Sequence, residues 1–225
     1  MFLPLPLALA EDGAAILARV DAAASRGQDA HVVLAVQVTD RVGVTADRVL
    51  EIWQKGDDKR LVRFTEPARL AGTGLLVPDG HTVYLFLPAF GKPRRIVGDQ
   101  RGDAFMGTDF SMEDLSRLSW ADEYTATLEA DEGDVLRLAL APKDSAAHRD
   151  ATVRLWVREA DSLVTKVEHV DAGGTVTRRL LLEDVRPVGS QPMAHHITVE
   201  YKHGAAGRGQ LPCYGLRHRG FAGAG

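Results

Sequence analysis

Few residues of this chain have the types and spacing needed for catalysis or metal binding. His195 and His196 are adjacent in a segment whose pattern predicts a strand. Neighbouring side chains of a strand point to opposite faces, so these two cannot ligate one metal ion together. Ser190 is followed by Pro192, where a nucleophile elbow requires glycine, and Cys213 is the only cysteine. We therefore expect no catalytic residue, no metal site and no cofactor.

A second group of residues that could take part in binding or catalysis consists of acids and bases near the middle of the chain. Its members are Arg94, Arg95, Asp99, Arg101, Asp103, Asp109, Glu113 and Asp114. Mixed charges on hairpins and at a helix N-terminus typically form solvated or partly buried ion pairs that hold a loop. The alternative is that Arg94 or Arg95 binds a lipid phosphate at the mouth of a cavity, because a guanidinium group matches phosphate geometry.

Composition and charge limit the class of function. The chain has 225 residues, of which 45% are hydrophobic and 26% charged, as is ordinary for one globular domain. Its net charge of −4 argues against nucleic acid as a partner, because phosphate binding requires a basic field.

The first ten residues, MFLPLPLALA, are apolar and end in Ala-Leu-Ala before an acidic pair. This pattern is typical of the end of a secretory signal peptide, although the basic region that normally begins one is missing. We expect that residues 1–10 are a signal remnant and that the mature chain starts at Glu11. A disordered apolar N-terminus is the alternative. No later stretch approaches the roughly 20 apolar residues of a spanning helix.

The hydrophobic pattern predicts the elements that position these residues. Apolar residues at helical spacing predict a helix over 12–26, and Ser111 with Asp114 at capping-box spacing predicts a short helix over 111–119. Period two predicts strands at 31–39, 47–55, 59–65, 74–77, 82–87, 123–130, 135–141, 152–159, 163–171, 175–183 and 194–202. Tight links make neighbouring strands pair antiparallel, so we expect an α+β domain built on a long antiparallel meander.

One hairpin and one loop gather large apolar side chains. Pro78-Asp79-Gly80 is turn chemistry between the strands at 74–77 and 82–87. The loop from Phe105 to Met112 carries two phenylalanines and two methionines. Exposing the large apolar side chains of a glycine-containing loop to water is unfavourable. This loop must therefore cover an apolar surface.

Five motifs follow one another in a fixed order. They are Phe64-x-Glu-Pro, Gly72-Thr-Gly-Leu-Leu, Tyr84-Leu-Phe-Leu-Pro, Arg94-Arg95-Ile96 and Phe105-Met-Gly-Thr-Asp-Phe-Ser-Met-Glu-Asp-Leu115. This order resembles the LolA-like family of outer-membrane lipoprotein-sorting proteins, especially the branch with a Phe-Met-Gly-Ser-Asp-Phe-Ser signature. The likeness is specific over residues 47–120 and colinear over 12–200. Thr108 replaces the serine of the signature and keeps its hydroxyl.

The resemblance implies a strongly curved, unclosed half-barrel with helices over its concave face. It further implies a periplasmic carrier that binds acyl chains and moves lipoproteins or other lipids between the inner and outer membranes. An inner-membrane transporter of the ABC or RND type is the implied partner, with only transient membrane contact. Together with the apolar loop, the resemblance predicts a hydrophobic pocket under an adjustable lid.

The candidate residues for this site come from the hairpin and the loop. The cavity and lid candidates are Leu75, Val77, Tyr84, Phe86, Phe90, Phe105, Met106, Phe110, Met112 and Leu115, and the headgroup candidates are Arg94 and Arg95.

The domain boundaries and two rival functions complete the expectations. Residues 11–203 are expected to form the lipid-binding domain, and the Gly- and Arg-rich tail at 204–225 is expected to be disordered or atypical. One rival function is a lipid-sensing regulatory module on the same fold. The other is a lipid-modifying enzyme, which the missing nucleophile and metal ligands disfavour.

The predicted signal remnant can be tested on exported protein. N-terminal sequencing of protein secreted from the full-length gene is expected to begin at Glu11, because signal peptidase cleaves after a small-x-small motif. An intact Met1 on the exported protein would contradict this expectation.

Overall fold

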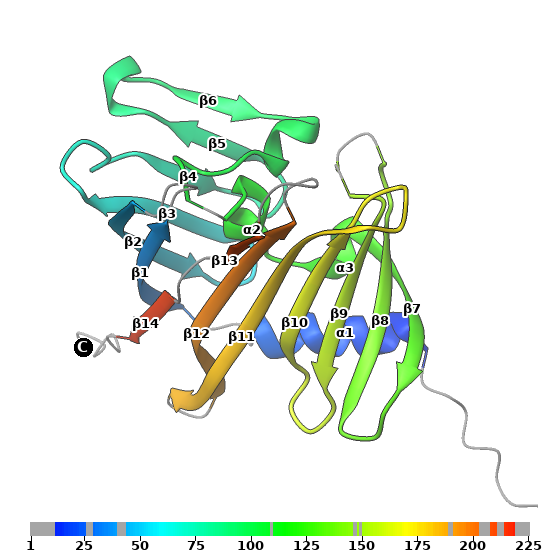
Figure 1. Cartoon of the computed structure of the whole chain (residues 1–225). Coiled ribbons are helices and arrows are strands. Elements are labelled where there is room, and N and C mark those ends of the chain that lie inside the picture. Colours follow the sequence, from blue (N-terminus) through cyan, green and yellow to red (C-terminus); the bar gives the residue numbers. More distant parts are fainter. Residues whose placement is uncertain are drawn as a thin grey trace, which may run out of the picture.

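The structure is a computed structural model that describes residues 12–25, 29–39, 44–108, 110–145, 148, 150–188, 191–202, 208–210 and 214–218. Within this part of the chain, 14 strands form one antiparallel sheet that bends around three α-helices (Figure 1). The predicted signal remnant at residues 1–10 lies outside the described residues.

The first half of the sheet contains six strands that pair in sequence order. They are β1 (Ala30–Thr39), β2 (Thr45–Lys55), β3 (Lys59–Glu66), β4 (Gly74–Val77), β5 (Val83–Phe86) and β6 (Pro93–Ile96). Burial alternates along them: Val62 and Phe64 of β3 are buried, whereas Leu61, before them, and Arg63, between them, are exposed. One face of this half therefore points to the core and the other to solvent.

The second half repeats this arrangement with six further strands. They are β7 (Tyr124–Asp131), β8 (Val135–Pro142), β9 (Thr152–Arg158), β10 (Leu163–Val170), β11 (Val176–Val188) and β12 (Gln191–Lys202). The alternation is clearest in β9, where Val153, Leu155 and Val157 are fully buried.

The two halves are joined through their first and last strands. β14 (Tyr214–His218) pairs with both β1 and β12, and β13 (Arg208–Gln210) pairs with β12. The sheet order is therefore β6-β5-β4-β3-β2-β1-β14-β12-β11-β10-β9-β8-β7, and the sheet does not close. The predicted curved antiparallel meander is confirmed, but sequence order is broken between β6 and β7, which lie at opposite edges, and between β13 and β14, which do not pair with each other.

The chain crosses the concave side of the sheet between these two edges. The crossing contains a 3₁₀ turn, η2 (Gly98–Gly102), and two short helices, α2 (Met112–Ser116) and α3 (Trp120–Glu123). The predicted helix over 111–119 is confirmed only over Met112–Ser116, because the backbone of Arg117 is extended. A further helix, α3, follows the predicted range, and Ser119 caps it by accepting from the backbone N–H of Asp122. Strand β6 was not predicted, since it begins with proline and carries two arginines; an edge strand tolerates both.

The remaining helix, α1 (Gly13–Ser25), lies across the inner face of the second half, as Figure 1 shows. Its buried side chains Ile16, Leu17 and Val20 join the core that both halves share. Asp21 of α1 accepts three hydrogen bonds of 2.8 Å from the Ser119 hydroxyl and from two backbone N–H groups at the start of α3. Helices therefore cover the concave face, as predicted.

Among the described residues, no helix has the length and apolar character that crossing a membrane requires.

Gly13 lets the first turn of α1 approach the backbone of β7. A Cβ at this position would lie 2.8 Å from the carbonyl oxygen of Ala126 and 2.9 Å from the backbone nitrogen of Leu128. Replacing glycine by alanine normally stabilises a helix by about 0.5–1 kcal/mol. Here the added Cβ would clash with the backbone of β7, so we expect Gly13→Ala to lower the free energy of unfolding by about 1–3 kcal/mol. Urea denaturation measures this change. Gly173→Ala, where Cβ would meet only a side-chain oxygen at 3.3 Å, is the matched control. A stabilised Gly13→Ala variant would contradict the expectation.

Candidate functional site

The segment that covers the concave face is a closed loop followed by α2, and we name residues 103–116 the lid segment. The two ends of the loop are held together by hydrogen bonds from the Phe105 N–H to the Phe110 carbonyl (2.8 Å) and from the Met112 N–H to the Asp103 carbonyl (2.9 Å). Met106 and Gly107 at the turn both have positive φ, 52° and 69°. Asp109 lies outside the described residues.

The hydroxyl of Thr108 stabilises this loop from within. Thr108 is 2% exposed, and its hydroxyl lies 2.7 Å from the Phe105 carbonyl and 3.3 Å from that of Phe110. A serine hydroxyl could make the same bonds, which explains physically why threonine can replace serine here.

The apolar side chains of the lid segment fill the concavity. Phe105 is 1% exposed and stacks on Phe64 of β3, with ring centroids 5.0 Å apart. Six of the predicted cavity and lid residues are buried together in the core: Leu75, Val77, Phe105, Phe110, Met112 and Leu115. Met106 packs against this cluster. The side chains of the lid segment therefore lie against the inner face of the sheet.

The other predicted site residues lie elsewhere. Tyr84 and Phe86 alternate with the buried Val83 and Leu85 on β5, so they point to the outer face of the sheet. Phe90, Arg94 and Arg95 are exposed in the β5–β6 hairpin. The structure therefore does not bring the headgroup candidates together with the buried cluster.

A hollow of about 130 Å³ is present at the edge of the crossing segment, but its lining is mostly polar. It is lined by Gly80, His81, Arg101, Leu118, Ser119, Asp122 and Glu123. This lining does not suit an acyl chain.

The N-terminus of α2 is fixed by the predicted capping box. The Ser111 hydroxyl accepts from the Asp114 N–H at 3.0 Å, and the Asp114 carboxylate accepts from the Ser111 N–H at 2.8 Å. The same carboxylate forms a bidentate ion pair with Arg178 of β11, with N–O distances of 2.5 and 2.9 Å. One carboxylate thus caps the helix and connects it to the second half of the sheet.

Arg178 is in turn held by His169 of β10. Arg178 Nη2 lies 2.7 Å from His169 Nε2, and His169 Nδ1 lies 2.6 Å from a carboxylate oxygen of Asp150. A guanidinium group can only donate, so Nε2 accepts and the proton is on Nδ1, which donates to Asp150. The row Asp150–His169–Arg178–Asp114 therefore leads from the sheet into the lid segment.

A second buried cluster lies along α2. Arg117 forms ion pairs with Glu113 and, at 3.2 Å, with Glu123, and its guanidinium lies 3.9 Å from the centroid of the Trp120 ring. Glu113 also accepts from the Tyr124 hydroxyl at 2.8 Å and lies 3.2 Å from His148 Nδ1. The predicted interpretation of the charges near the helix, ion pairs that hold a loop, is confirmed for Glu113 and Asp114.

The C-terminus of α2 is bound by the first half of the sheet. Arg60 of β3 donates to the Arg117 carbonyl at 2.6 Å and to the Leu115 carbonyl at 3.4 Å. Burial, followed by the nearby charge of Arg117, lowers the pKa of Arg60 to about 10, which leaves it charged at neutral pH. The helix is therefore attached to β3 at one end and to β11 at the other.

The carboxyl groups of α2 stay ionised because of their partners. Burial alone would raise the pKa of Asp114, but the charge of Arg178 and its hydrogen bonds to the carboxylate hold that pKa below its ordinary value. Burial would also raise the pKa of Glu113. Hydrogen bonding to His148 and the charge of Arg117 outweigh this effect, so the pKa of Glu113 is lowered as well.

Glu113, Glu123 and His148 offer ligand atoms within 4.8 Å of one another, as a metal site would. The guanidinium of Arg117 already lies against both carboxylates. A metal ion would bring a second cation into the same buried space, so these residues fit a buried arginine better than a metal ion.

The sequence analysis missed the partners of the lid segment. Arg178 and Asp114 are 64 positions apart, and Arg60 and Arg117 are 57 apart. Arg60 and Arg178 occupy ordinary strand positions, so no local pattern distinguishes them from solvated arginines.

Comparison with protein families gives one match. A family model described as "Uncharacterized protein" matches residues 56–208, which is more than half of the chain. The chain belongs to this family. The comparison with curated proteins found no match.

Solved structures share the fold. A LolA superfamily protein from Nitrosomonas europaea is 19% identical with a TM-score of 0.74, and the match covers 92% of each chain. A DUF1329 family protein from Desulfovibrio piger is 23% identical with a TM-score of 0.76, and the match covers 92% of this chain and 91% of that one. A domain described as outer membrane lipoprotein-sorting, from Vibrio parahaemolyticus, is 21% identical with a TM-score of 0.76 and 92% coverage of both. The predicted LolA-like fold is confirmed.

Asp114 provides a test of how the lid segment is held. Replacing Asp114 by Asn leaves the buried charge of Arg178 without its carboxylate partner, so we expect a loss of about 3 kcal/mol in the free energy of unfolding at neutral pH. The folded-state pKa of Asp114 is below the ordinary 3.8, so its contribution is complete above that value and is lost as the pH falls further. The difference between the variant and the wild type should therefore shrink in acid, measured by urea denaturation across pH.

The matched control is Asp184→Asn. Asp184 pairs with Arg186, but both are exposed, so removing this pair should change stability little. An equal loss for the two variants, or a loss for Asp114→Asn that does not depend on pH, would contradict the role given to Asp114.

Proposed function

We propose that this protein is a periplasmic carrier that binds acyl chains of lipoproteins or other lipids and moves them between the inner and outer membranes. One observation carries the proposal: the apolar inner face of an unclosed sheet is covered by apolar side chains of a separate segment, the lid segment, which belongs to none of the strands. Withdrawal of the lid segment would uncover an apolar surface suited to hydrocarbon.

The lid segment is attached in a way that permits such movement. It is bound to the two halves of the sheet mainly by side chains, through Arg60 and Arg178, and not by a strand ladder. Its apolar residues, with Phe105 on Phe64, take the place that acyl chains would take. Exchanging one apolar surface for another keeps the buried area nearly constant, so a carrier could both load and release its cargo.

The residues proposed to contact acyl chains are the buried members of the predicted set. These are Leu75, Val77, Phe105, Met106, Phe110, Met112 and Leu115. Each acyl methylene that they bury would contribute about 0.8 kcal/mol, without hydrogen bonds that would make release slow.

The printed names of the structural neighbours support this proposal. One neighbour is a LolA superfamily protein and another is described as an outer membrane lipoprotein-sorting domain. By the same resemblance, we propose that an inner-membrane transporter of the ABC or RND type delivers the cargo, and that the protein binds lipid without transforming it.

Incubation of the purified protein with a bacterial lipid extract, followed by native mass spectrometry, tests the proposal. We expect intact lipids to remain bound, and we expect the loaded protein to pass them from donor to acceptor vesicles. Chemically processed lipid would instead indicate an enzyme, and lipid that is bound but never transferred would indicate a sensor. A protein that retains no lipid would refute the carrier proposal.

Loosening the lid segment should change the rate of loading. Asp114→Asn removes the ion pair to Arg178, so we expect a fluorescent fatty acid to enter several-fold faster than in the wild type, measured by stopped-flow fluorescence. Circular dichroism at the same temperature verifies that the variant is folded. Asp184→Asn is the control and should load at the wild-type rate; unchanged loading by both variants would argue against a moving lid.

A further inference from the structure

The β5–β6 hairpin exposes a phenylalanine at its tip. The turn η1 (Pro88–Phe90) begins with proline and ends at Gly91, whose φ of 65° is left-handed. Phe90 is 76% exposed, the largest value among the large hydrophobic side chains that the structure describes as exposed. A benzene ring held in water by a rigid turn costs free energy unless something covers it.

A second phenylalanine lies beside the tip. Phe86, the last residue of β5, is 37% exposed and pairs in register with Pro93, the first residue of β6. Leu76 of the neighbouring strand β4 is 43% exposed on the same outer face. The apolar surface therefore continues from the turn onto the outer face of the sheet.

The hairpin is basic although the protein is acidic. Residues 80–98 contain Lys92, Arg94 and Arg95 and no acidic residue, whereas the whole chain has a net charge of −4. All three basic side chains are exposed. The end of β3 adds one exposed acid, Glu66, and the β3–β4 connection adds one exposed base, Arg69, so their charges cancel.

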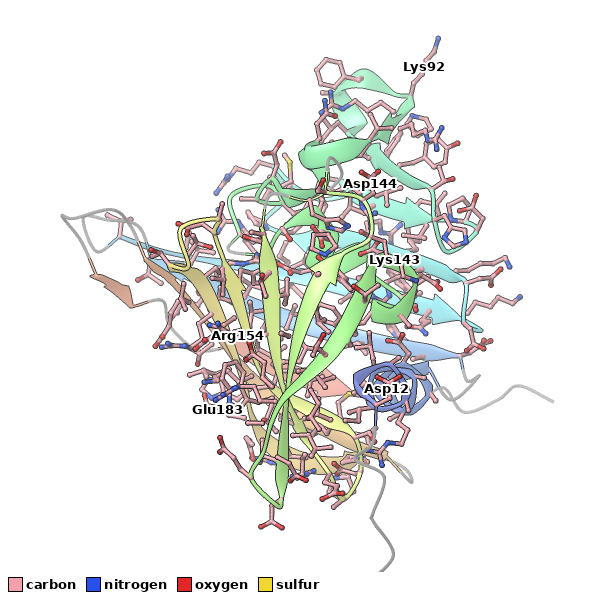
Figure 2. The ribbon with its side chains drawn as sticks, turned by 90° about the vertical axis from the view of Figure 1, so that its right-hand side faces the viewer. Asp12, Lys92, Lys143, Asp144, Arg154 and Glu183 are labelled. Atoms are coloured by element: carbon pink, nitrogen blue, oxygen red, sulfur yellow. The ribbon has the colours of Figure 1, made fainter. Side chains whose placement is uncertain are left out.

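The hairpin also projects from the rest of the molecule. β5 and β6 lie at the free edge of the first half of the sheet, away from β7–β12 (Figure 1). Figure 2 shows Lys92 at the far end of the protein with its side chain pointing away from it. A flat surface could therefore touch the tip without meeting the other half of the sheet.

We propose that this tip docks on the surface of a lipid bilayer that carries anionic headgroups. Phe90 enters the interface between headgroups and acyl chains, with Phe86 at its border. Lys92, Arg94 and Arg95 bind the phosphates around it, since long basic side chains can place their charges at the headgroup level. A membrane fits better than a protein groove, because the tip combines one projecting ring with flexible cations and no defined hydrogen-bond pattern.

This inference is independent of the cargo site. The tip shares no residue with the lid segment or with the cluster proposed to contact acyl chains. Binding to vesicles can therefore be measured with cargo-free protein, and its failure would leave the carrier proposal standing. A carrier without lipid cargo, conversely, could still bind vesicles.

Co-sedimentation with vesicles tests the docking proposal. We expect the wild type to bind vesicles of equal parts phosphatidylglycerol and phosphatidylcholine and to bind pure phosphatidylcholine much less. Each basic residue near an anionic surface strengthens binding about fivefold, so replacing Lys92, Arg94 and Arg95 together by Gln should weaken it by about a hundredfold. Phe90→Ser should weaken binding about tenfold, and added salt should weaken the wild type but not the triple variant.

Two matched controls localise the effect. Val97→Ser changes an exposed apolar residue, 53% exposed, at the opposite end of the same hairpin. The second control is the triple variant Lys55→Gln, Lys59→Gln and Lys143→Gln, which removes three positive charges from other exposed positions. Both controls should bind like the wild type.

The opposite results would overturn the proposal. These are equal binding to the two kinds of vesicle, no binding to either, or losses as large in the controls as in the tip variants. If the tip serves a protein partner instead, the wild type will bind neither kind of vesicle.

Discussion

The closed structure depends on one buried ion pair, between Asp114 of the lid segment and Arg178 of β11. Apolar contacts are strong in sum but have no preferred direction, so they cannot by themselves set the position of a short helix. The Asp114 carboxylate does so, because it must satisfy both the Ser111 N–H and a guanidinium in fixed geometry. An unpaired charge in this place would cost several kcal/mol, so the ion pair opposes small displacements of the lid segment.

The lid segment also bears on the proposed carrier function, because a protein that holds hydrocarbon must be stable in water without it. Its own phenylalanine and methionine side chains cover the concave face of the described sheet, so the apolar residues beneath them are buried. Arg60, Arg178 and Arg117 add polar bonds to these apolar contacts, so withdrawal of the lid segment would break both kinds of contact unless cargo replaced the apolar ones. Polar bonds of this kind are sensitive to pH and to nearby charges, so under the proposed function they would provide a means of release that a purely apolar lid would lack.

The two proposed surfaces lie on different parts of one sheet. The lid segment binds β3 and β11 on the inner face, whereas the β5–β6 tip lies at an open edge and continues onto the outer face. Tyr84 and Phe86, expected in the cavity from their motif, are placed on the outer side by the alternation of β5. Substitutions in one of the two proposed surfaces are therefore expected to leave the other unchanged.

Local chemistry in the sequence determined most elements of this protein. The period of two along the strands, the turn at Pro78-Asp79-Gly80 and the capping box of Ser111 and Asp114 act between near neighbours, so they can be recognised without coordinates. Tertiary structure alone decided that β6 and β7 lie at opposite edges, that Arg178 and Arg60 hold the lid segment, and that Phe90 is exposed. The two arginine contacts join residues about 55–65 positions apart, and the exposure of Phe90 depends on which face of the sheet is covered. Such pairings arise only when the whole sheet bends and brings its two halves around the same short helix.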